Sequence, residues 1–260
     1  MRGLAAPLPI MKRRLILAAF ILVGLSATAG SFAFVWWAWP RLPDPLAPRA
    51  GTTERLVDVG ILVLLALHGF FFSAHRSVVR LHAKLEGCEQ ALAAFLKGVL
   101  LILLAVLWTP WGEPGLTQSG IILWLSRAAF ILGALLHLSA AAAVGNEALL
   151  GYDGLRRLLE GRPPPKIPGT YALAWTGPFA RVRHPFTLAT IILLACGAPF
   201  AGERLLVASG AAACLLPSAW TRERTLLRLG GEAYRRYQER TGFLLPRSSR
   251  PTRAETRAQD

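Results

Sequence analysis

The segment Ile121–Val144, IILWLSRAAFILGALLHLSAAAAV, decides the class of fold to which the chain belongs. Its only charged residue is Arg127, and apolar or small residues fill most of the other positions. About 20 apolar residues in a helix are enough to cross the hydrocarbon core of a bilayer. The backbone polar groups of such a segment must be satisfied within the segment, so it is predicted to be a membrane-spanning helix.

Five further apolar segments have a similar character. They are Leu15–Trp39, Leu56–Ser73, Ala91–Trp108, Pro185–Phe200 and Leu205–Trp220. The sequence therefore predicts an all-α, polytopic membrane protein with about six transmembrane helices, of which the first four occupy residues 15–144. The last two segments are short and close together, so residues 185–220 are predicted to form a helical hairpin. The first segment also has the basic start and small-residue end of a signal peptide, and its cleavage would leave five spans.

The composition agrees with a membrane location. The 260 residues are 53% hydrophobic and 17% charged, with a net charge of +14 and a mean hydropathy of +0.43. Soluble domains usually carry about a quarter charged residues, so the composition favours a membrane protein, and the aqueous parts are too short to suggest a separate soluble domain. The basic excess is spread over the predicted loops and includes no nucleic-acid-binding motif, so the predicted partner is the lipid bilayer and not a nucleic acid. The three cysteines have no metal-binding spacing, and no metal site is predicted.

The distribution of Lys and Arg predicts the orientation. Most of these residues lie before the first span and after the second, fourth and sixth spans, and cytoplasmic loops are enriched in them. Both termini are therefore predicted to be cytoplasmic, and the membrane is predicted to be the bacterial inner membrane. Residues 1–14 form a basic cytoplasmic N-terminus, residues 221–241 a cytoplasmic amphipathic closing helix broken at Gly230-Gly231, and residues 247–260 a disordered polar tail.

The segment RVRHPFTLAT, residues 181–190, combines charged residues with a helix start. Proline is favoured at the first position of a helix, so Pro185 places a helix N-terminus beside Arg183 and His184. That end of a helix has a partial positive charge, and a bound anion would offset the added positive charge of Arg183. Ordinary positive flanking of a membrane helix explains the same pattern, and the residues alone leave both interpretations open.

Other polar residues are candidates for chemistry. Glu223 lies between two arginines and could act as a base, although a surface ion pair is the simpler interpretation. Tyr234 and Tyr237 are three residues apart and could line a pocket or anchor the chain at the interface. His68, His75 and His82 are seven residues apart and could share one helical face. With His137 they suggest haem ligation, for which hydrogen bonds between helices are the alternative.

Two later segments resemble a known family. TGPFARVRHPFTLAT, residues 176–190, resembles the Gly-Pro-Tyr and Arg-His-Pro signature of the isoprenylcysteine carboxyl methyltransferase-like membrane enzymes. RERTLLRLGGEAYRRYQERTGFLLP, residues 222–246, resembles their closing Glu-x₂-Leu, Gly, Tyr-x₂-Tyr and Pro signature. Upstream, HRSVVR at residues 75–80 and GLRR at residues 154–157 resemble the methanethiol S-methyltransferase branch. Order and spacing agree, which makes the pair of signatures more specific than either one.

The resemblance implies a membrane methyltransferase that uses S-adenosylmethionine, has its catalytic region in residues 145–246, and methylates a small or lipophilic thiol. The implied catalytic residues are Arg183, His184 and Glu223. The implied cofactor-binding residues are Gly177, Arg183, His184, Pro185, Glu223, Tyr234 and Tyr237, and the implied substrate residues are His75, Arg80 and Thr187. The chain departs from the family pattern at Phe179, Thr187, Ala189 and Arg222.

The sequence leaves two other functions open. Sterol-reductase-like membrane enzymes have a similar closing helix and use NADPH. A non-catalytic membrane protein that binds haem or lipid would depend on His68 and His137. The Arg-His-Pro signature favours methyl transfer over the sterol-reductase-like alternative.

Overall fold

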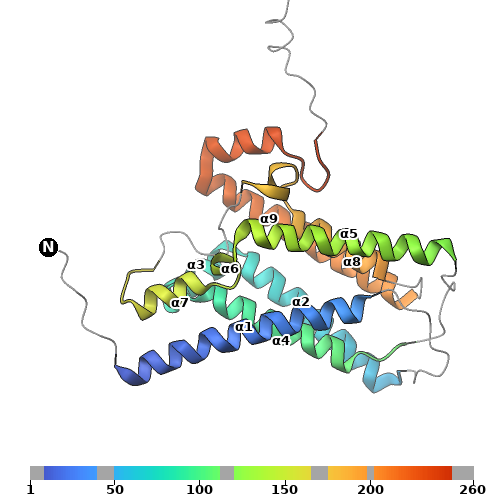
Figure 1. The fold of residues 1–260 in the computed structure, drawn as a ribbon, viewed down its shortest axis with the longest axis horizontal. Coiled ribbons are helices and arrows are strands. Elements are labelled where there is room, and N and C mark those ends of the chain that lie inside the picture. Colours follow the sequence, from blue (N-terminus) through green and yellow to red (C-terminus); the bar gives the residue numbers. More distant parts are fainter. Residues whose placement is uncertain (1–8, 40–49, 112–119, 165–174, 198–201, 248–260) are drawn as a thin grey trace, which may run out of the picture.

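Long apolar helices dominate the computed structural model, which describes residues 9–39, 50–111, 120–164, 175–197 and 202–247 (Figure 1). All regular secondary structure in these ranges is helical, which confirms the all-α prediction. Four helices there are long and apolar enough to cross a membrane. They are α1 (Ile10–Ala38), α2 (Thr52–Ser73), α4 (Glu89–Leu107) and α5 (Ile121–Val144). The chain is therefore compatible with a multi-pass membrane protein.

The ends of these helices lie close to the predicted ends. The range of α5 is the predicted one, and α1 starts five residues before the predicted Leu15. This early start includes Lys12, Arg13 and Arg14, because basic residues form helix readily although they end an apolar run. The predicted N-terminal residues 1–8, the tail from residue 248 and the end of the fifth segment at Phe200 lie outside the described residues.

The last two helices differ most from the prediction. The fifth segment forms α8 (Pro185–Gly197), a short apolar helix, and the sixth is part of α9 (Gly202–Arg240). The predicted boundary at residue 220 does not interrupt α9, because neither glycine nor an inner proline lies between Trp220 and Gly230. At Gly231 the backbone has φ +50° and ψ −129°, which breaks the helix where the sequence predicted a break.

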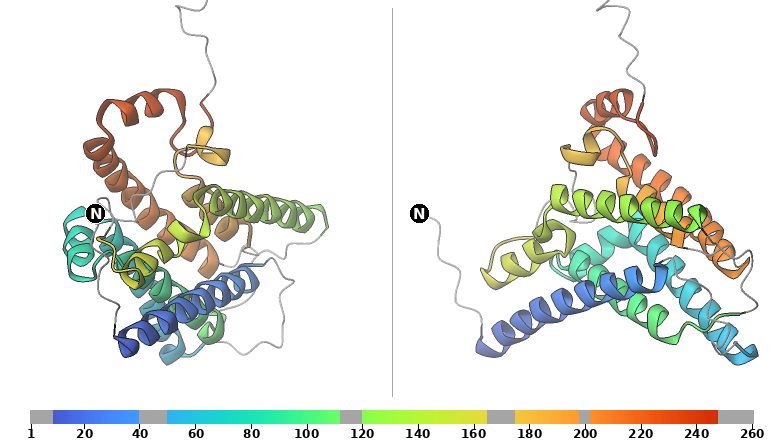
Figure 2. Two further views of the ribbon diagram at one scale, coloured as in Figure 1. Left: turned by 60° about the vertical axis from the view of Figure 1, so that its left-hand side comes forward. Right: turned by 45° about the vertical axis from the view of Figure 1, so that its right-hand side comes forward.

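Neighbouring helices form a chain of contacts. α1 packs on α4, α4 on α2, α2 on α9, α9 on α8, and α8 on α5. Figures 1 and 2 show α1, α2 and α4 together on one side, with α5, α8 and α9 on the other. The backbones of α1 and α4 approach closely because Gly30 and Gly98 face each other. Helices in membranes commonly approach through such small residues, since these allow close van der Waals packing.

Short helices lie between the long ones. α3 (His75–Lys84) follows α2 after a break at Ala74, whose backbone is extended. α6 (Asn146–Leu149) and α7 (Tyr152–Leu159) follow α5, and α7 packs against α1 and α4. Because Ala74 separates two helices, the predicted common helical face of His68, His75 and His82 is wrong. His68 Nε2 instead lies 3.0 Å from the Ala93 carbonyl oxygen on α4, a hydrogen bond between helices.

The close approach of α1 and α4 gives a first prediction. A methyl group at Gly98 would overlap the backbone of Ser26 and Ala27, so Gly98→Ala should reduce the free energy of unfolding by about 1–3 kcal/mol. Gly60→Ala in α2 is the matched control, because a methyl group there meets no atom within 4 Å. Thermal unfolding of the purified protein in detergent measures both changes. Equal effects of the two substitutions would contradict the tight α1–α4 contact.

Candidate functional site

Two segments far apart in the sequence lie side by side at the start of α8. Val182 and Gly242 form an isolated parallel bridge. The Arg183 amide donates to the Gly242 carbonyl at 2.8 Å, and the His184 amide donates to the Phe243 carbonyl at 3.2 Å. The break at Gly231 makes this possible, since it redirects the last turns of α9 before the chain returns (Figure 1).

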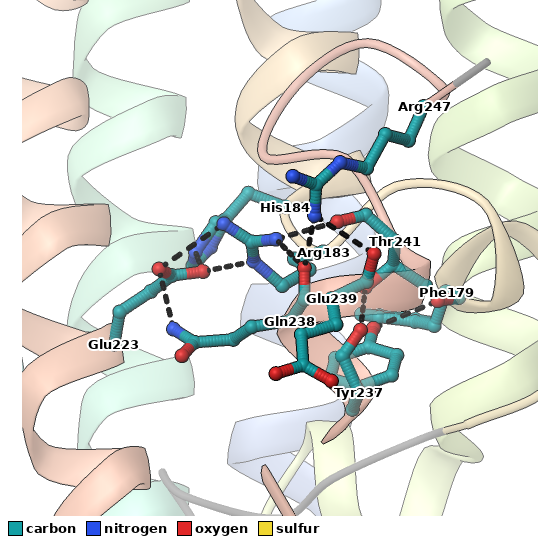
Figure 3. A network of polar contacts seen from close by, with 9 residues as sticks. All are labelled: Phe179, Arg183, His184, Glu223, Tyr237, Gln238, Glu239, Thr241 and Arg247. Carbon is teal, nitrogen blue, oxygen red and sulfur yellow. Dashed lines mark hydrogen bonds and ion pairs between the residues drawn. The ribbon is translucent and has the colours of Figure 1, made fainter. Parts of the chain in front are cut away.

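The Arg183 guanidinium bonds to α9 at Glu223 and also to the end of that helix, next to the returning chain (Figure 3). Its Nε and Nη2 donate to the two carboxylate oxygens of Glu223, in the two-pronged geometry that strengthens such pairs. Its Nη1 donates to the carbonyls of Gln238 at 3.1 Å and Thr241 at 2.5 Å. The last carbonyls of a helix have no partners within the helix, so Arg183 also caps the end of α9.

The Glu223 carboxylate is the centre of the network. Besides the two bonds from Arg183, it accepts bonds from His184 Nε2 at 3.2 Å and from Gln238 Nε2 at 3.0 Å. Its side chain is only 10% exposed. Burial alone would raise the pKa of Glu223, but the hydrogen bonds and positive charge of its partners outweigh burial, so the pKa is lowered. Glu223 is therefore ionised at neutral pH.

His184 is neutral in this setting. Burial lowers its pKa more than the bond to Glu223 raises it. A neutral imidazole has one donor and one acceptor nitrogen, and the contact with an ionised carboxylate assigns the proton to Nε2. Nδ1 is then the nitrogen that can accept a proton, so any general-base role of His184 must use Nδ1.

Aromatic residues extend the network on one side. The Tyr237 hydroxyl donates to the Phe179 carbonyl at 2.7 Å, which ties the 3-10 turn η2 (Gly177–Ala180) to α9. The ring of Trp175 meets Tyr237 edge to face at 4.6 Å between centroids, and Tyr234 at 6.5 Å. Burial raises the pKa of both tyrosines, so each hydroxyl stays protonated. Trp175 is 45% exposed and therefore presents aromatic surface outward.

The remaining predicted cofactor residues lie nearby. Gly177 has φ +59°, a backbone conformation that favours glycine. Pro185 is buried and begins α8, as predicted. Thr187, a predicted substrate residue, is half-buried on α8. The preceding Phe186 contacts both Phe179 and His137 with its ring, which links α5 to the turn before α8.

The other predicted substrate residues are on α3 and outside the network. α3 reaches the site through Val78, which is fully buried and packs against Leu226 and Tyr234. Arg80 is exposed and lines a separate cavity, and His75 begins the helix. In the described ranges of the chain, no cluster of three or more His, Cys, Asp or Glu residues could hold a metal ion.

Sequence reasoning missed Gln238 and Thr241. Both come after the helix break, so helical spacing from Glu223 could not place them beside that carboxylate. Their contacts also bear on one of the two interpretations of Arg183, that of an anion site. Four of its five N–H groups now have partners within the chain, and Glu223 balances its charge. A ligand carboxylate would meet one remaining Nη2 hydrogen or would have to displace Glu223.

Comparison of the chain with protein-family models, with curated proteins and with solved structures gives no match. The family resemblance therefore depends on the two quoted signatures and on the upstream echoes.

The Glu223 network gives a second prediction. Glu223→Gln leaves the buried Arg183 charge unbalanced and should reduce the free energy of unfolding by about 3–5 kcal/mol. The matched control is Glu232→Gln, which alters an exposed 3.9 Å pair with Arg235 and should change stability by less than about 1 kcal/mol. Thermal unfolding in detergent compares the two. Equal losses would show that Glu223 is no more than a surface carboxylate.

The lowered pKa of His184 gives a third prediction. A group whose pKa is lower in the folded state binds fewer protons there, so the free energy of unfolding falls as pH decreases below the ordinary value of 6.5. Glu223 adds to this loss below its ordinary value of 4.5. The unfolding midpoint should therefore drop between about pH 7 and pH 5, and His184→Asn should flatten that drop. An unchanged pH profile in the variant would be the contrary result.

Proposed function

We propose that the protein is an integral membrane methyltransferase that uses S-adenosylmethionine and methylates a small or lipophilic thiol. One observation carries the proposal. Arg183 and His184, from the first signature, both contact Glu223, which opens the second signature 40 residues later. Tyr237, also from the second signature, bonds to Phe179 of the first. Residues that the resemblance assigns to one cofactor site thus lie in one cluster.

The membrane arrangement belongs to the same proposal. The apolar helix α8 and the apolar first half of α9 would cross the bacterial inner membrane as a closely packed pair, which gives six spans with both termini in the cytoplasm. The loops richest in Lys and Arg would then be cytoplasmic, as the charge rule expects. The Glu223 network would face the compartment that supplies a soluble, charged cofactor.

The aromatic side chains fit a cationic ligand. S-adenosylmethionine supplies a methyl group on a positively charged sulfur. The faces of Trp and Tyr rings attract cations, most strongly where water is excluded. Trp175 and Tyr237 bring two such rings beside the network, and both contact the buried ring of Tyr234. The pairing of Arg183 with Glu223 supports this assignment, because an unbalanced guanidinium would repel a sulfonium ion.

The chain's own residues would act mainly by positioning. Arg183 and Glu223 hold the start of α8 against the end of α9, and Tyr237 ties the turn η2 to α9, which would fix the walls around the reacting groups. Holding an acceptor sulfur in line with a methyl group is the largest contribution expected for such a transfer. A thiol must lose its proton to become the nucleophile, and His184 Nδ1 is the acceptor that the hydrogen-bond pattern leaves available.

Cofactor binding gives the fourth prediction. Purified protein in detergent should bind S-adenosylmethionine in isothermal titration calorimetry and should methylate members of a thiol panel. Trp175→Leu should weaken binding by about tenfold or more, because it removes a cation-attracting ring. Trp220→Leu on α9 is the matched control, since that ring is 62% exposed and outside the cluster.

Three outcomes of this experiment have distinct meanings. Binding and transfer that Trp175→Leu reduces, and Trp220→Leu does not, support both the function and the site. Equal loss in both variants would contradict the aromatic site. Binding of NADPH by the intact protein, without binding of S-adenosylmethionine, would replace methyl transfer with the reductase-like alternative.

A further inference from the structure

A cavity of about 200 Å³ lies where α2 meets α3, away from the Glu223 network. Its lining residues are Phe71, Ser77, Arg80, Leu81 and Lys84. Four of these are on α3 at a spacing of three or four residues, which places them on one helical face. Phe71 comes from the last turn of α2.

The polar part of the lining is suited to a phosphate group. Arg80 and Lys84 are both exposed, and within the described ranges neither has a carboxylate partner. Like charges four residues apart on a helix repel each other, so an anion between them would relieve that repulsion. Arginine binds phosphate in a two-pronged manner, and the Ser77 hydroxyl adds a hydrogen-bond donor on the same face.

The apolar part of the lining favours a phospholipid over free phosphate. Phe71 and Leu81 form the remaining wall, and the Phe71 ring is 47% exposed. The cavity also lies at the end of α2, a helix long and apolar enough to cross a membrane. The ends of such helices lie at the depth of the lipid headgroups. A ligand with a phosphate beside an apolar chain satisfies both parts. Free phosphate would leave the aromatic and aliphatic wall uncovered.

We propose that this cavity binds the phosphate of an anionic phospholipid. The proposal requires the membrane location but not methyl transfer. Binding would also bear on the candidate site, because Val78 on another face of α3 packs against Tyr234 and Leu226. A lipid held by Arg80 and Lys84 would fix α3, and with it the wall on which the Tyr234 ring rests.

The test uses full-length protein in a neutral detergent and native mass spectrometry. Dioleoylphosphatidylglycerol is titrated, with dioleoylphosphatidylcholine and inorganic phosphate as separate arms. Arg80→Gln and Lys84→Gln should each weaken phosphatidylglycerol binding about fivefold, the effect of one cation on an anionic lipid headgroup. Arg76→Gln is the matched control, because it removes the same charge from α3 without lining the cavity.

Each result decides the proposal. Loss of phosphatidylglycerol binding in Arg80→Gln and Lys84→Gln, with Arg76→Gln unchanged and phosphatidylcholine weak, supports it. Equal loss of phosphatidylglycerol binding in all three variants would indicate non-specific electrostatic attraction and would overturn the proposal. Displacement of the lipid by millimolar inorganic phosphate would also overturn it, in favour of a soluble-phosphate site. All three residues are exposed, so circular dichroism should show unchanged helix content in each variant.

Discussion

The ion pair between Arg183 and Glu223 is the interaction on which the candidate site depends. It joins the start of α8 to the part of α9 before the break at Gly231, and the same guanidinium caps the end of α9, after the break, through two carbonyls. Two buried charges are costly unless each is paired and hydrogen-bonded. Here four of the five Arg183 N–H groups have partners, and Glu223 accepts bonds from Arg183, His184 and Gln238. The Glu223 carboxylate thus joins the Arg-His-Pro segment to both parts of α9, while the Tyr237 hydroxyl ties the turn η2 to the same helix.

The break at Gly231 allows Arg183 to bond to the end of α9 as well as to Glu223. A straight α9 would carry Gln238 and Thr241 away from Arg183, because each helical residue adds about 1.5 Å along the axis. Glycine accepts the φ of +50° found there with little strain. The amphipathic end of α9 thus turns back over the site. The conformation of one glycine therefore allows residues of the two signatures to contact each other.

Much of the fold could be predicted from sequence, because long apolar runs such as Ile121–Val144 have one stable form in lipid. The break at Gly231 could be predicted for a similar reason, since two glycines interrupt an otherwise helical pattern. The site was harder to predict. Arg183, His184 and Glu223 were found through chemistry and resemblance, but their mutual pairing was not. Helical periodicity does not continue past the break, so it could not place Gln238. The seven-residue spacing of the histidines did not predict the extended backbone at Ala74, which separates two helices.

The proposed cofactor site lies between the turn η2, the start of α8 and the end of α9. Hydrogen exchange of the intact protein in detergent, with and without S-adenosylhomocysteine, tests that claim most directly. If the ligand binds there, exchange should slow mainly in residues 175–184 and 232–247 when the ligand is present. Exchange that is unchanged throughout the chain, or slowed only in other helices, would contradict it.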